Sequence, residues 1–195
     1  MIKIGITGGI GSGKSIVCEV FRQLGAHVYI ADLRAKELMN NDPNIKQSLI
    51  SKFGKSIYKN NQLDRELMAG LIFEKRAAIE FVNSLVHPVV ARDFDLWSEQ
   101  YKSDSYIIEE TAILFESGAF KRMDKVITVF APFELRINRV VKRDKVTVGQ
   151  VEQRINNQIP DEEKIKLADF IIYNDYTHSV LEQVLNLHNF FLSSK

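Results

Sequence analysis

One short segment near the N-terminus constrains the possible folds of this chain more than any other. Residues 8–15 read Gly-Gly-Ile-Gly-Ser-Gly-Lys-Ser and match the pattern G-x-x-x-x-G-K-[ST] in full. The apolar, β-branched residues 2–7 before it predict a buried strand, and residues 14–24 after it show helical spacing, ending at Gly25. A glycine-rich turn without a ligand is the alternative interpretation, but these flanks are the context in which the pattern binds phosphate. The segment therefore predicts a nucleotide-phosphate site.

The residue types of this loop define its expected chemistry. Glycines let the backbone bend so that successive N–H groups point at phosphate oxygens, and the helix N-terminus adds its positive dipole end. Lys14 is expected to reach the β- and γ-phosphates of ATP, and the Ser15 hydroxyl to ligate Mg²⁺. The predicted ATP-binding residues of the loop are Gly9, Gly11, Ser12, Gly13, Lys14 and Ser15.

The remaining sequence predicts more strands of the same sheet and two helical stretches. Short apolar runs predict strands at Val28–Ile30, Tyr106–Ile108, Val126–Phe130 and Phe170–Tyr173. Residues 33–101 and 133–167 look helical throughout, and the first of these stretches is broken at residues 40–43, at Gly54 and at His87-Pro88. Strand, loop, helix and strand in this order form the unit of a parallel α/β sheet, so the fold is predicted to be α/β with a five-stranded parallel sheet.

The class of nucleotide protein follows from what the chain lacks and from its two helical stretches. No Asn is followed by Lys, as the guanine-reading motif of a regulatory GTPase requires, and neither of the last two predicted strands ends in the Asp typical of motor ATPases. Kinases must exclude water, or ATP is hydrolysed, and a closing lid does this. We therefore predict a P-loop kinase core (1–32 with 105–132 and 168–195), a helical acceptor-binding insertion (33–104) and a helical lid (133–167).

Composition excludes several partners. The chain has 195 residues with 26 Lys+Arg and 25 Asp+Glu, a net charge of +1, so neither nucleic acid nor an anionic membrane is an expected partner. A single cysteine excludes an internal disulfide. No apolar run approaches the roughly 20 residues of a membrane span, and no targeting signal is visible, so we expect a cytoplasmic monomer or small homo-oligomer.

Charged residues at the predicted carboxyl edge of the sheet are candidates for catalysis. Asp32 follows the second strand, where it would accept the proton of an acceptor hydroxyl or, alternatively, cap the next helix. Glu109 and Glu110 follow the third strand and would organise Mg²⁺ through water or bind the acceptor, a solvated loop being the alternative.

A basic stretch lies in the predicted lid. Arg136, Arg139 and Arg143 share one helical face, which would close over ATP and neutralise charge on the transferring phosphoryl group. The alternative is a solvated helix face.

Together these residues resemble the dephospho-coenzyme A kinase family almost from end to end. Beyond the phosphate loop, the resemblance rests on short segments that occur in order and at the family's spacing. They are Phe21-x-x-Leu24-Gly25, Ala31-Asp32, Leu63-Asp64-Arg65, Ile72-Phe73, Leu85-Val86-His87-Pro88, Leu114-Phe115-Glu116, Arg139-x-x-x-Arg143-Asp144, Gln158, Ala168-Asp169 and Ile172-x-Asn174.

The resemblance implies transfer of the ATP γ-phosphoryl group to the ribose 3′-hydroxyl of dephospho-coenzyme A, with ATP and Mg²⁺ as cofactors. It implies catalytic roles for Asp32 as the base, for Lys14 and for Arg139. It also implies that Arg139 and Arg143 are lid arginines of the ATP site and that Asn174 lies near its adenine end. The implied substrate-binding residues are Asp32, Arg65, His87, Leu114 and Glu116.

Three positions depart from the family pattern. Ile30 replaces the first Asp of Asp-Ala-Asp, Ala112 replaces the usual Pro, and Ile16 replaces a common Thr, although the backbone N–H of Ile16 is still expected to bind phosphate. Two alternative functions therefore stay open. One is another nucleoside or nucleotide kinase on the same scaffold, and the other is a nucleotide-binding switch module that has lost catalysis.

Overall fold

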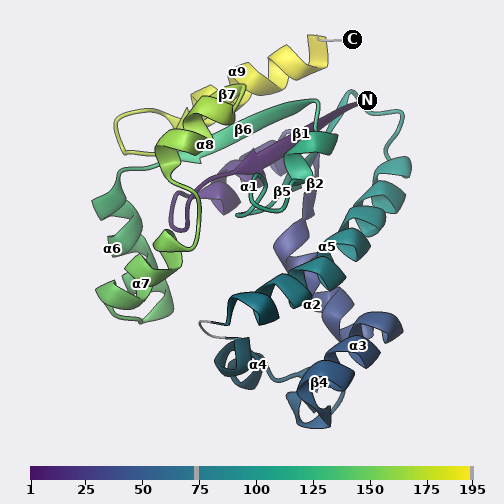
Figure 1. The fold of residues 1–195 in the computed structure, drawn as a ribbon. Helices are drawn as coiled ribbons and strands as arrows, with labels where there is room; N and C mark the ends of the chain where they lie inside the picture. Colours follow the sequence, from purple (N-terminus) through teal and green to yellow (C-terminus); the bar gives the residue numbers. More distant parts are fainter. Residues whose placement is uncertain (73–74, 194–195) are drawn as a thin grey trace. The chain divides into compact units, whose positions relative to one another are not determined.

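The computed structural model describes residues 1–72 and 75–193 (Figure 1). Residues 73–74 of the predicted acceptor insertion and 194–195 of the predicted core therefore lie outside the described residues. The chain divides into two compact units, and we describe each by itself. The first comprises residues 1–30 and 98–195, and the second comprises residues 31–97.

The first unit is built on a five-stranded sheet in the order β2-β5-β1-β6-β7. All neighbouring strands are parallel, which confirms the predicted α/β fold class. The strands are β1 (Ile2–Thr7), β2 (His27–Ile30), β5 (Tyr106–Glu110), β6 (Lys125–Phe130) and β7 (Phe170–Tyr173). At the carboxyl edge, Ile6 of the central strand β1 is in register with Glu110 of β5 and with Ile127 of β6.

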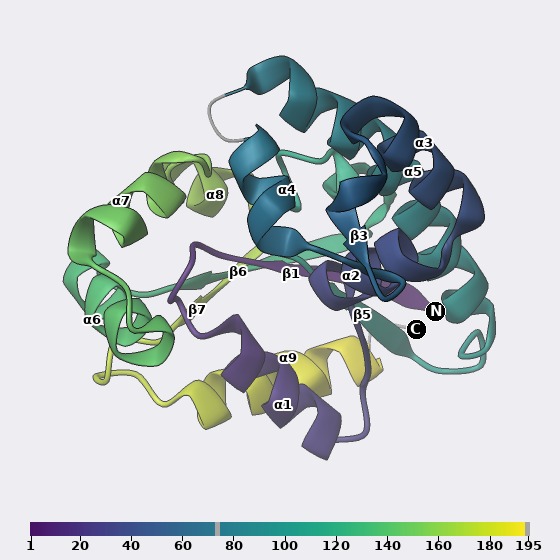
Figure 2. The ribbon, with the colours of Figure 1, turned by 90° about the horizontal axis from the view of Figure 1, so that it is seen from below.

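One face of this sheet packs on two helices, α1 (Lys14–Gln23) and α9 (Val180–Ser193), which lie together on that face in Figure 2. Alternate residues of β1, Ile4 and Ile6, are fully buried in the core formed there with residues of both helices. Gly25 has φ 91° and follows the end of α1, where Ala26 N donates to Phe21 O at 3.0 Å. A second hydrogen bond, from Gly25 N to Arg22 O at 2.9 Å, accompanies it, so the last carbonyls of α1 are satisfied where the chain turns into β2.

The other part of the first unit comes from the segments after β5 and β6. The loop after β5 leads into a 3₁₀ helix, η2 (Ala119–Arg122), and β6 is followed by α6 (Phe133–Asp144), α7 (Val148–Asn156) and α8 (Asp161–Leu167). Thr147 and Gln150 form a reciprocal capping box that starts α7. Ile10 of the phosphate loop packs against a small core that contains Val140 of α6 and Val151 of α7. Figures 1 and 2 show the loop after β1 pointing toward α6 and α7.

The second unit is mostly helical, as predicted, but not throughout. It contains α2 (Ala31–Asn41), α3 (Pro43–Phe53), η1 (Lys55–Ile57), β3 (Tyr58–Lys59), β4 (Gln62–Leu63), α4 (Arg65–Ile72) and α5 (Arg76–Glu99). The predicted break at residues 40–43 is confirmed, because Asp42 caps α3 by accepting from Asn44 N and Ile45 N. The small antiparallel pair β3–β4 was not predicted. Its turn residues Asn60 and Asn61 have φ 51° and 65°, values that Asn tolerates better than most residues.

The prediction of a helix junction at His87-Pro88 is wrong. Pro88 lies inside α5, which continues from Arg76 to Glu99. Proline removes one helical hydrogen bond, the one that would end on the carbonyl of Ser84. Ser84 is exposed, so water is available to this carbonyl and lowers the cost.

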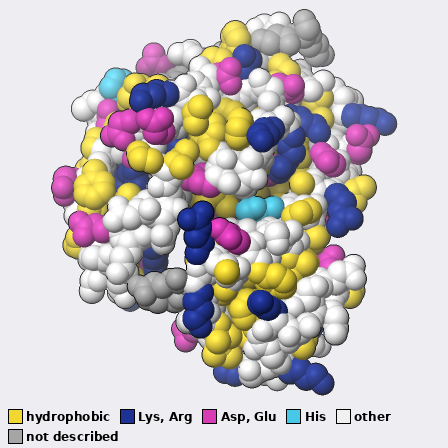
Figure 3. Space-filling view, in the orientation of Figure 1, with side chains coloured by type: hydrophobic (Ala, Val, Ile, Leu, Met, Phe, Trp, Pro, Cys, Tyr) yellow, Lys and Arg dark blue, Asp and Glu magenta, His cyan; other side chains and the backbone are white. Residues whose placement is uncertain are grey.

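Two further observations concern the charge of the surface and the length of apolar helices. On the face drawn in Figure 3, Lys and Arg side chains are interspersed with Asp and Glu, so neither sign of charge dominates it. Among residues 1–72 and 75–193, no helix combines the length and apolar character that a membrane crossing requires.

Candidate active site

The loop between β1 and α1 has the backbone conformation that the phosphate-binding pattern requires. Gly11 and Gly13 adopt φ 81° and 98°, which side-chain-bearing residues rarely adopt. A Cβ atom on Gly11 would lie 2.6 Å from Arg136 O, and one on Gly13 would collide with the amide of Asn174. The glycines therefore serve two purposes, because they permit the bend and let α6 and the end of β7 approach the loop.

The loop's polar side chains suit a phosphate group. The Lys14 ammonium donates to Gly8 O at 3.0 Å, so it lies over the loop. The Ser12 hydroxyl is buried and has no hydrogen-bond partner among the described residues, which is unusual for a buried polar group. Ile16 N–H, which is predicted to bind phosphate, donates to Gly13 O at 3.0 Å in this structure.

The residues also fit a magnesium ion that reaches the site with ATP. Ser15 is exposed in the first turn of α1, so its hydroxyl is accessible to a metal. Within the described part of the chain, no group of three or more His, Cys, Asp or Glu side chains forms a metal cage. This donor set suits Mg²⁺, which keeps several waters and binds through substrate phosphates and one or two protein ligands.

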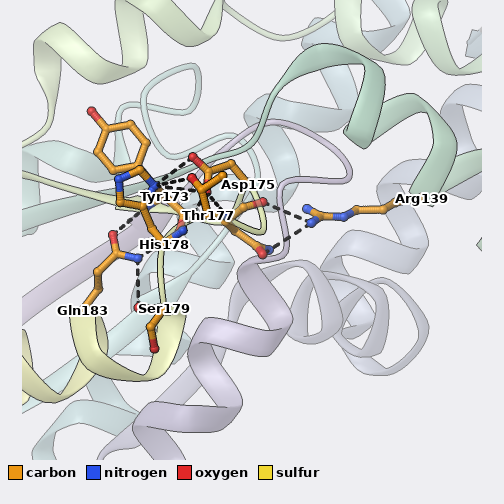
Figure 4. A network of polar contacts seen from close by, with 8 residues as sticks. Arg139, Tyr173, Asp175, Thr177, His178, Ser179 and Gln183 are labelled. Atoms are coloured by element: carbon orange, nitrogen blue, oxygen red, sulfur yellow. Dashed lines mark hydrogen bonds and ion pairs between the residues drawn. The ribbon is translucent and has the colours of Figure 1, made fainter.

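Arg139 and Asn174 both donate hydrogen bonds to the backbone of the phosphate loop. Asn174 Nδ2 donates to Ser12 O at 2.8 Å, and Arg139 donates to Asn174 O at 3.1 Å and to Gly11 O at 3.4 Å. Figure 4 shows Arg139 reaching from α6 to the turn that follows β7. The guanidinium lies 4.8 Å from the ring centroid of Tyr176 in this turn. The structure thus brings two predicted ATP-site residues together at the phosphate loop.

Tyr176 lies in a turn that is closed by several hydrogen bonds. The Asp175 carboxylate accepts from the backbone N–H groups of Thr177 and His178, at 3.0 and 3.1 Å, and from the Thr177 hydroxyl at 2.9 Å (Figure 4). Desolvation by itself raises the pKa of Asp175, but these hydrogen bonds outweigh it and hold that pKa well below its ordinary value of 3.8. Gln183 then binds both backbone groups of Tyr173 and joins the end of β7 to α9.

The three arginines of the predicted basic face have three different environments. Arg136 is buried, forms an ion pair with Asp161 and donates from Nε to Ile10 O at 2.8 Å. A Cβ atom on Gly9 would collide with its guanidinium, so this group lies directly against the phosphate loop. Burial lowers the pKa of Arg136, although the group stays charged. Arg136 was not among the predicted site residues, and only its place in the basic stretch pointed to it.

Arg143 does not share this environment. Its side chain is 63% exposed and forms an ion pair with Asp144 at 2.7 Å, and Arg154 of α7 contacts the same carboxylate at 2.8 Å. Hydrogen bonds from Arg143, followed by those from Arg154, lower the pKa of Asp144. In this structure, the predicted lid arginine Arg143 therefore pairs with its neighbour Asp144, and Arg154 joins that carboxylate to α7, whereas Arg139 contacts the phosphate loop.

The segment after β5 carries two predicted substrate-binding residues, and both are engaged within the first unit. Leu114 is fully buried, and a Cβ atom on Gly5 of β1 would lie 2.7 Å from its Cδ2 atom, so Leu114 packs in the core rather than at an accessible surface. Glu116 accepts from Ile159 N at 3.0 Å and forms an ion pair with Lys164 at 3.3 Å. The burial of Leu114 and the contacts of Glu116 together fix the position of the segment that follows β5.

Lys164 and Gln158 are the main polar residues that sequence analysis did not assign to the site. Lys164 is fully buried, and its ammonium donates to Ala112 O at 3.3 Å. Burial lowers the pKa of Lys164, and the negative charge of Glu116 opposes this shift. Gln158 donates to Ala112 O at 3.1 Å and accepts from Ile10 N at 2.9 Å. Gln158 stood out only as one of the residues that carry the family resemblance, and Lys164 gave no signal, because their partners are mostly backbone atoms.

The prediction that Glu109 and Glu110 follow the third strand is wrong. Both lie within β5 and are buried. Glu109 is 1% exposed and pairs with Arg122 of η2 at 2.5 Å, so a charge partner compensates for its burial. Glu110 lies at the carboxyl end of β5, in register with Ile6 two residues before the phosphate loop.

The remaining predicted residues belong to the second unit. Asp32 is exposed in the first turn of α2, which begins at Ala31, so Asp32 lies inside the helix rather than capping it. Arg65 is exposed at the start of α4, and His87 is half-buried in α5.

The parallel sheet and the glycine loop that opens α1 define a protein of the P-loop fold, the class to which small-molecule kinases with this loop belong. A family model described as Dephospho-CoA kinase matches residues 2–179. A Bacteroides fragilis protein named dephospho-CoA kinase is 40% identical over 186 residues, covering 95% of this chain and 91% of that protein. The chain belongs to the dephospho-CoA kinase family.

Solved structures agree with this assignment. A Thermus thermophilus protein superposes with a TM-score of 0.84 at 31% identity and covers 99% of this chain and 98% of that one. A dephospho-CoA kinase from Campylobacter jejuni superposes with a TM-score of 0.72 at 26% identity, covering 97% of this chain and 96% of that one.

Proposed function

We propose that this protein transfers the γ-phosphoryl group of ATP to the ribose 3′-hydroxyl of dephospho-coenzyme A, giving coenzyme A and ADP. The observation that carries the proposal is an intact phosphate loop, held by Arg139 and Asn174, in a chain that matches its family over residues 2–179. Mg²⁺, with Ser15 as a protein ligand, belongs to the proposal. When bound, it neutralises charge on the phosphates. A cytoplasmic monomer or small homo-oligomer stays a prediction.

Each proposed role follows from the chemistry of phosphoryl transfer. The 3′-oxygen forms a bond to the γ-phosphorus, the bond from that phosphorus to the β,γ-bridging oxygen breaks, and ADP leaves. We propose Asp32, in the first turn of α2 after the carboxyl end of β2, as the group that receives the hydroxyl proton. Lys14 and Arg139 stabilise negative charge on the phosphates as the transfer proceeds.

Roles in acceptor binding are proposed for Arg65 and His87, and separately for the segment 112–116. Support for Arg65 and His87 comes from family resemblance. Support for the segment 112–116 comes also from its anchoring by Gln158, Lys164 and buried Leu114, because a well-ordered loop loses little conformational entropy on binding. Arg143 and Asn174 are proposed to act at the ATP site, Asn174 through the loop that it holds.

A panel of acceptors at fixed ATP and Mg²⁺ tests this function. We expect kcat/KM with dephospho-coenzyme A to exceed that with adenosine or AMP by at least ~10²-fold, because each lost contact group is worth about 1–3 kcal/mol. NMR of the product should place the new phosphate on the ribose 3′-oxygen. Equal efficiency with a nucleoside monophosphate would favour the other nucleotide kinases. ATP binding without transfer to any acceptor would instead identify a switch module.

A further inference from the structure

We infer that Gln158 is a positioning residue that couples the ATP loop to the segment 112–116. This inference rests on the proposed function, since it assigns those two segments to the two substrates. The side chain lies between α7 and α8 and is half-buried. Its Oε1 accepts from Ile10 N at 2.9 Å, and its Nε2 donates to Ala112 O at 3.1 Å. The partners fix the orientation of the carboxamide, because an N–H requires the oxygen and a carbonyl requires the nitrogen.

The Gln158 side chain thus forms a bridge between Ile10 and Ala112, and further side chains bind the backbone at both of its ends. At the loop end, Arg136 Nε donates to Ile10 O at 2.8 Å, so side chains from the region 133–167 bind both backbone polar groups of Ile10. At the other end, the buried Lys164 ammonium is a second donor to Ala112 O, at 3.3 Å. The rigid carboxamide therefore joins two backbone groups whose other contacts already restrict their movement.

This arrangement predicts reciprocal coupling between the two substrates. A ligand that favours one position of the phosphate loop also favours one position of Gln158, and hence of Ala112. Binding of the second ligand then costs less, and linkage requires the same factor in both directions. The bridge contributes to catalysis only through alignment, because its two polar groups are already bound to the protein backbone.

Two substitutions separate the halves of the bridge. Gln158→Leu removes both hydrogen bonds at similar volume. Gln158→Glu keeps an oxygen that accepts from Ile10 N but no longer donates to Ala112 O. Gln153→Leu and Gln153→Glu are the matched controls, since Gln153 is exposed on α7.

The measurement is calorimetric binding of a non-hydrolysable ATP analogue with Mg²⁺, with and without saturating dephospho-coenzyme A. In the wild type, we expect the acceptor to tighten binding by about fivefold or more. Gln158→Leu should weaken binding of the analogue alone by about fivefold, the value of one ordinary hydrogen bond, and reduce the coupling ratio toward one. Gln158→Glu should leave binding of the analogue alone within about twofold of wild type and still lose coupling.

The Gln153 control variants should keep the wild-type coupling ratio. If the role of Gln158 were purely structural, the Gln158 variants would keep that ratio as well. A wild-type ratio of one, or an unchanged ratio in Gln158→Leu, overturns the inference. Failure of the proposed function is distinguishable, because the wild type would then not phosphorylate dephospho-coenzyme A at all.

Discussion

Asp161 forms an ion pair with Arg136, the buried arginine that binds the phosphate loop, and the substitution Asp161→Asn tests how much this pair stabilises the fold. The Arg136 side chain is 2% exposed and Asp161 is 18% exposed. Asparagine keeps the shape of the aspartate and one acceptor oxygen but removes the charge. The variant leaves a buried guanidinium with neutral acceptors, namely the new amide oxygen and Ile10 O at 2.8 Å from Nε.

The expected cost follows from this geometry. Removing one partner of a buried ion pair typically lowers the free energy of unfolding by about 3–5 kcal/mol. Partial exposure of Asp161 and the retained acceptor reduce that figure here, so we expect a loss of about 2–3 kcal/mol. For a chain of this length, this loss corresponds to a decrease in Tm of roughly 4–12 °C. Urea unfolding followed by circular dichroism at pH 7 measures it.

Glu163→Gln is the matched control. It also removes one negative charge from the first turn of α8, so effects on net charge and on the helix dipole are similar in the two variants. Glu163, however, pairs with Lys166 on the surface, where their side chains are 54% and 68% exposed, and its loss should cost no more than about 0.5 kcal/mol. In an Arg136→Met background, Asp161→Asn should cost less than in the wild type. Equal losses for Asp161→Asn and Glu163→Gln would refute the reasoning.

Three further outcomes are expected. Arg139→Ala should lower kcat/KM on the order of 10²-fold, because Arg139 contacts the phosphate loop, whereas Arg76→Ala, which breaks an exposed pair with Glu80, should change it less than about threefold; steady-state kinetics of the two variants compare them. Asp32→Asn should lower kcat by about 10²–10⁴-fold with little change in Kd for either substrate, and a loss confined to Tm would contradict its role as a base. The pKa of Asp175 is lowered by folding, so its charge stabilises the protein above pH 3.8 and this stabilisation is lost as the pH falls. The Tm difference between wild type and Asp175→Ala should therefore be largest near pH 7 and shrink toward pH 3.

The parts of the fold that follow from local patterns were predictable. The bounds of β1 and β7 were predicted to the residue, and all five strands of the sheet were found, because short apolar runs between polar segments predict buried parallel strands. The end of α1 was marked by Gly25 and the start of α3 by Asp42-Pro43, residues whose backbone or capping preferences are local.

The errors came from interactions between distant segments. Glu109 and Glu110 were predicted to follow the third strand, since the apolar run ends at Ile108 and carboxylates are rarely buried. The structure buries both, and Arg122, which comes 13 positions after Glu109, neutralises the deeper one. The division of the basic stretch into a buried, a loop-bound and an exposed arginine depends likewise on Asp161 and on the phosphate loop. A charged segment read alone does not specify these partners.

The departure at Ala112 shows why the site tolerates changes in residue type. The family usually has proline there, and the contacts to this position in the structure, from Gln158 and Lys164, end on its backbone carbonyl. Proline and alanine present the same carbonyl, so the anchor of the segment 112–116 survives the replacement. The phosphate loop follows the same rule, because Lys14 binds Gly8 O, Asn174 binds Ser12 O and Arg136 binds Ile10 O. The side chains that hold these loops are therefore the sensitive positions, whereas the residues they bind are free to vary wherever backbone conformation and space permit.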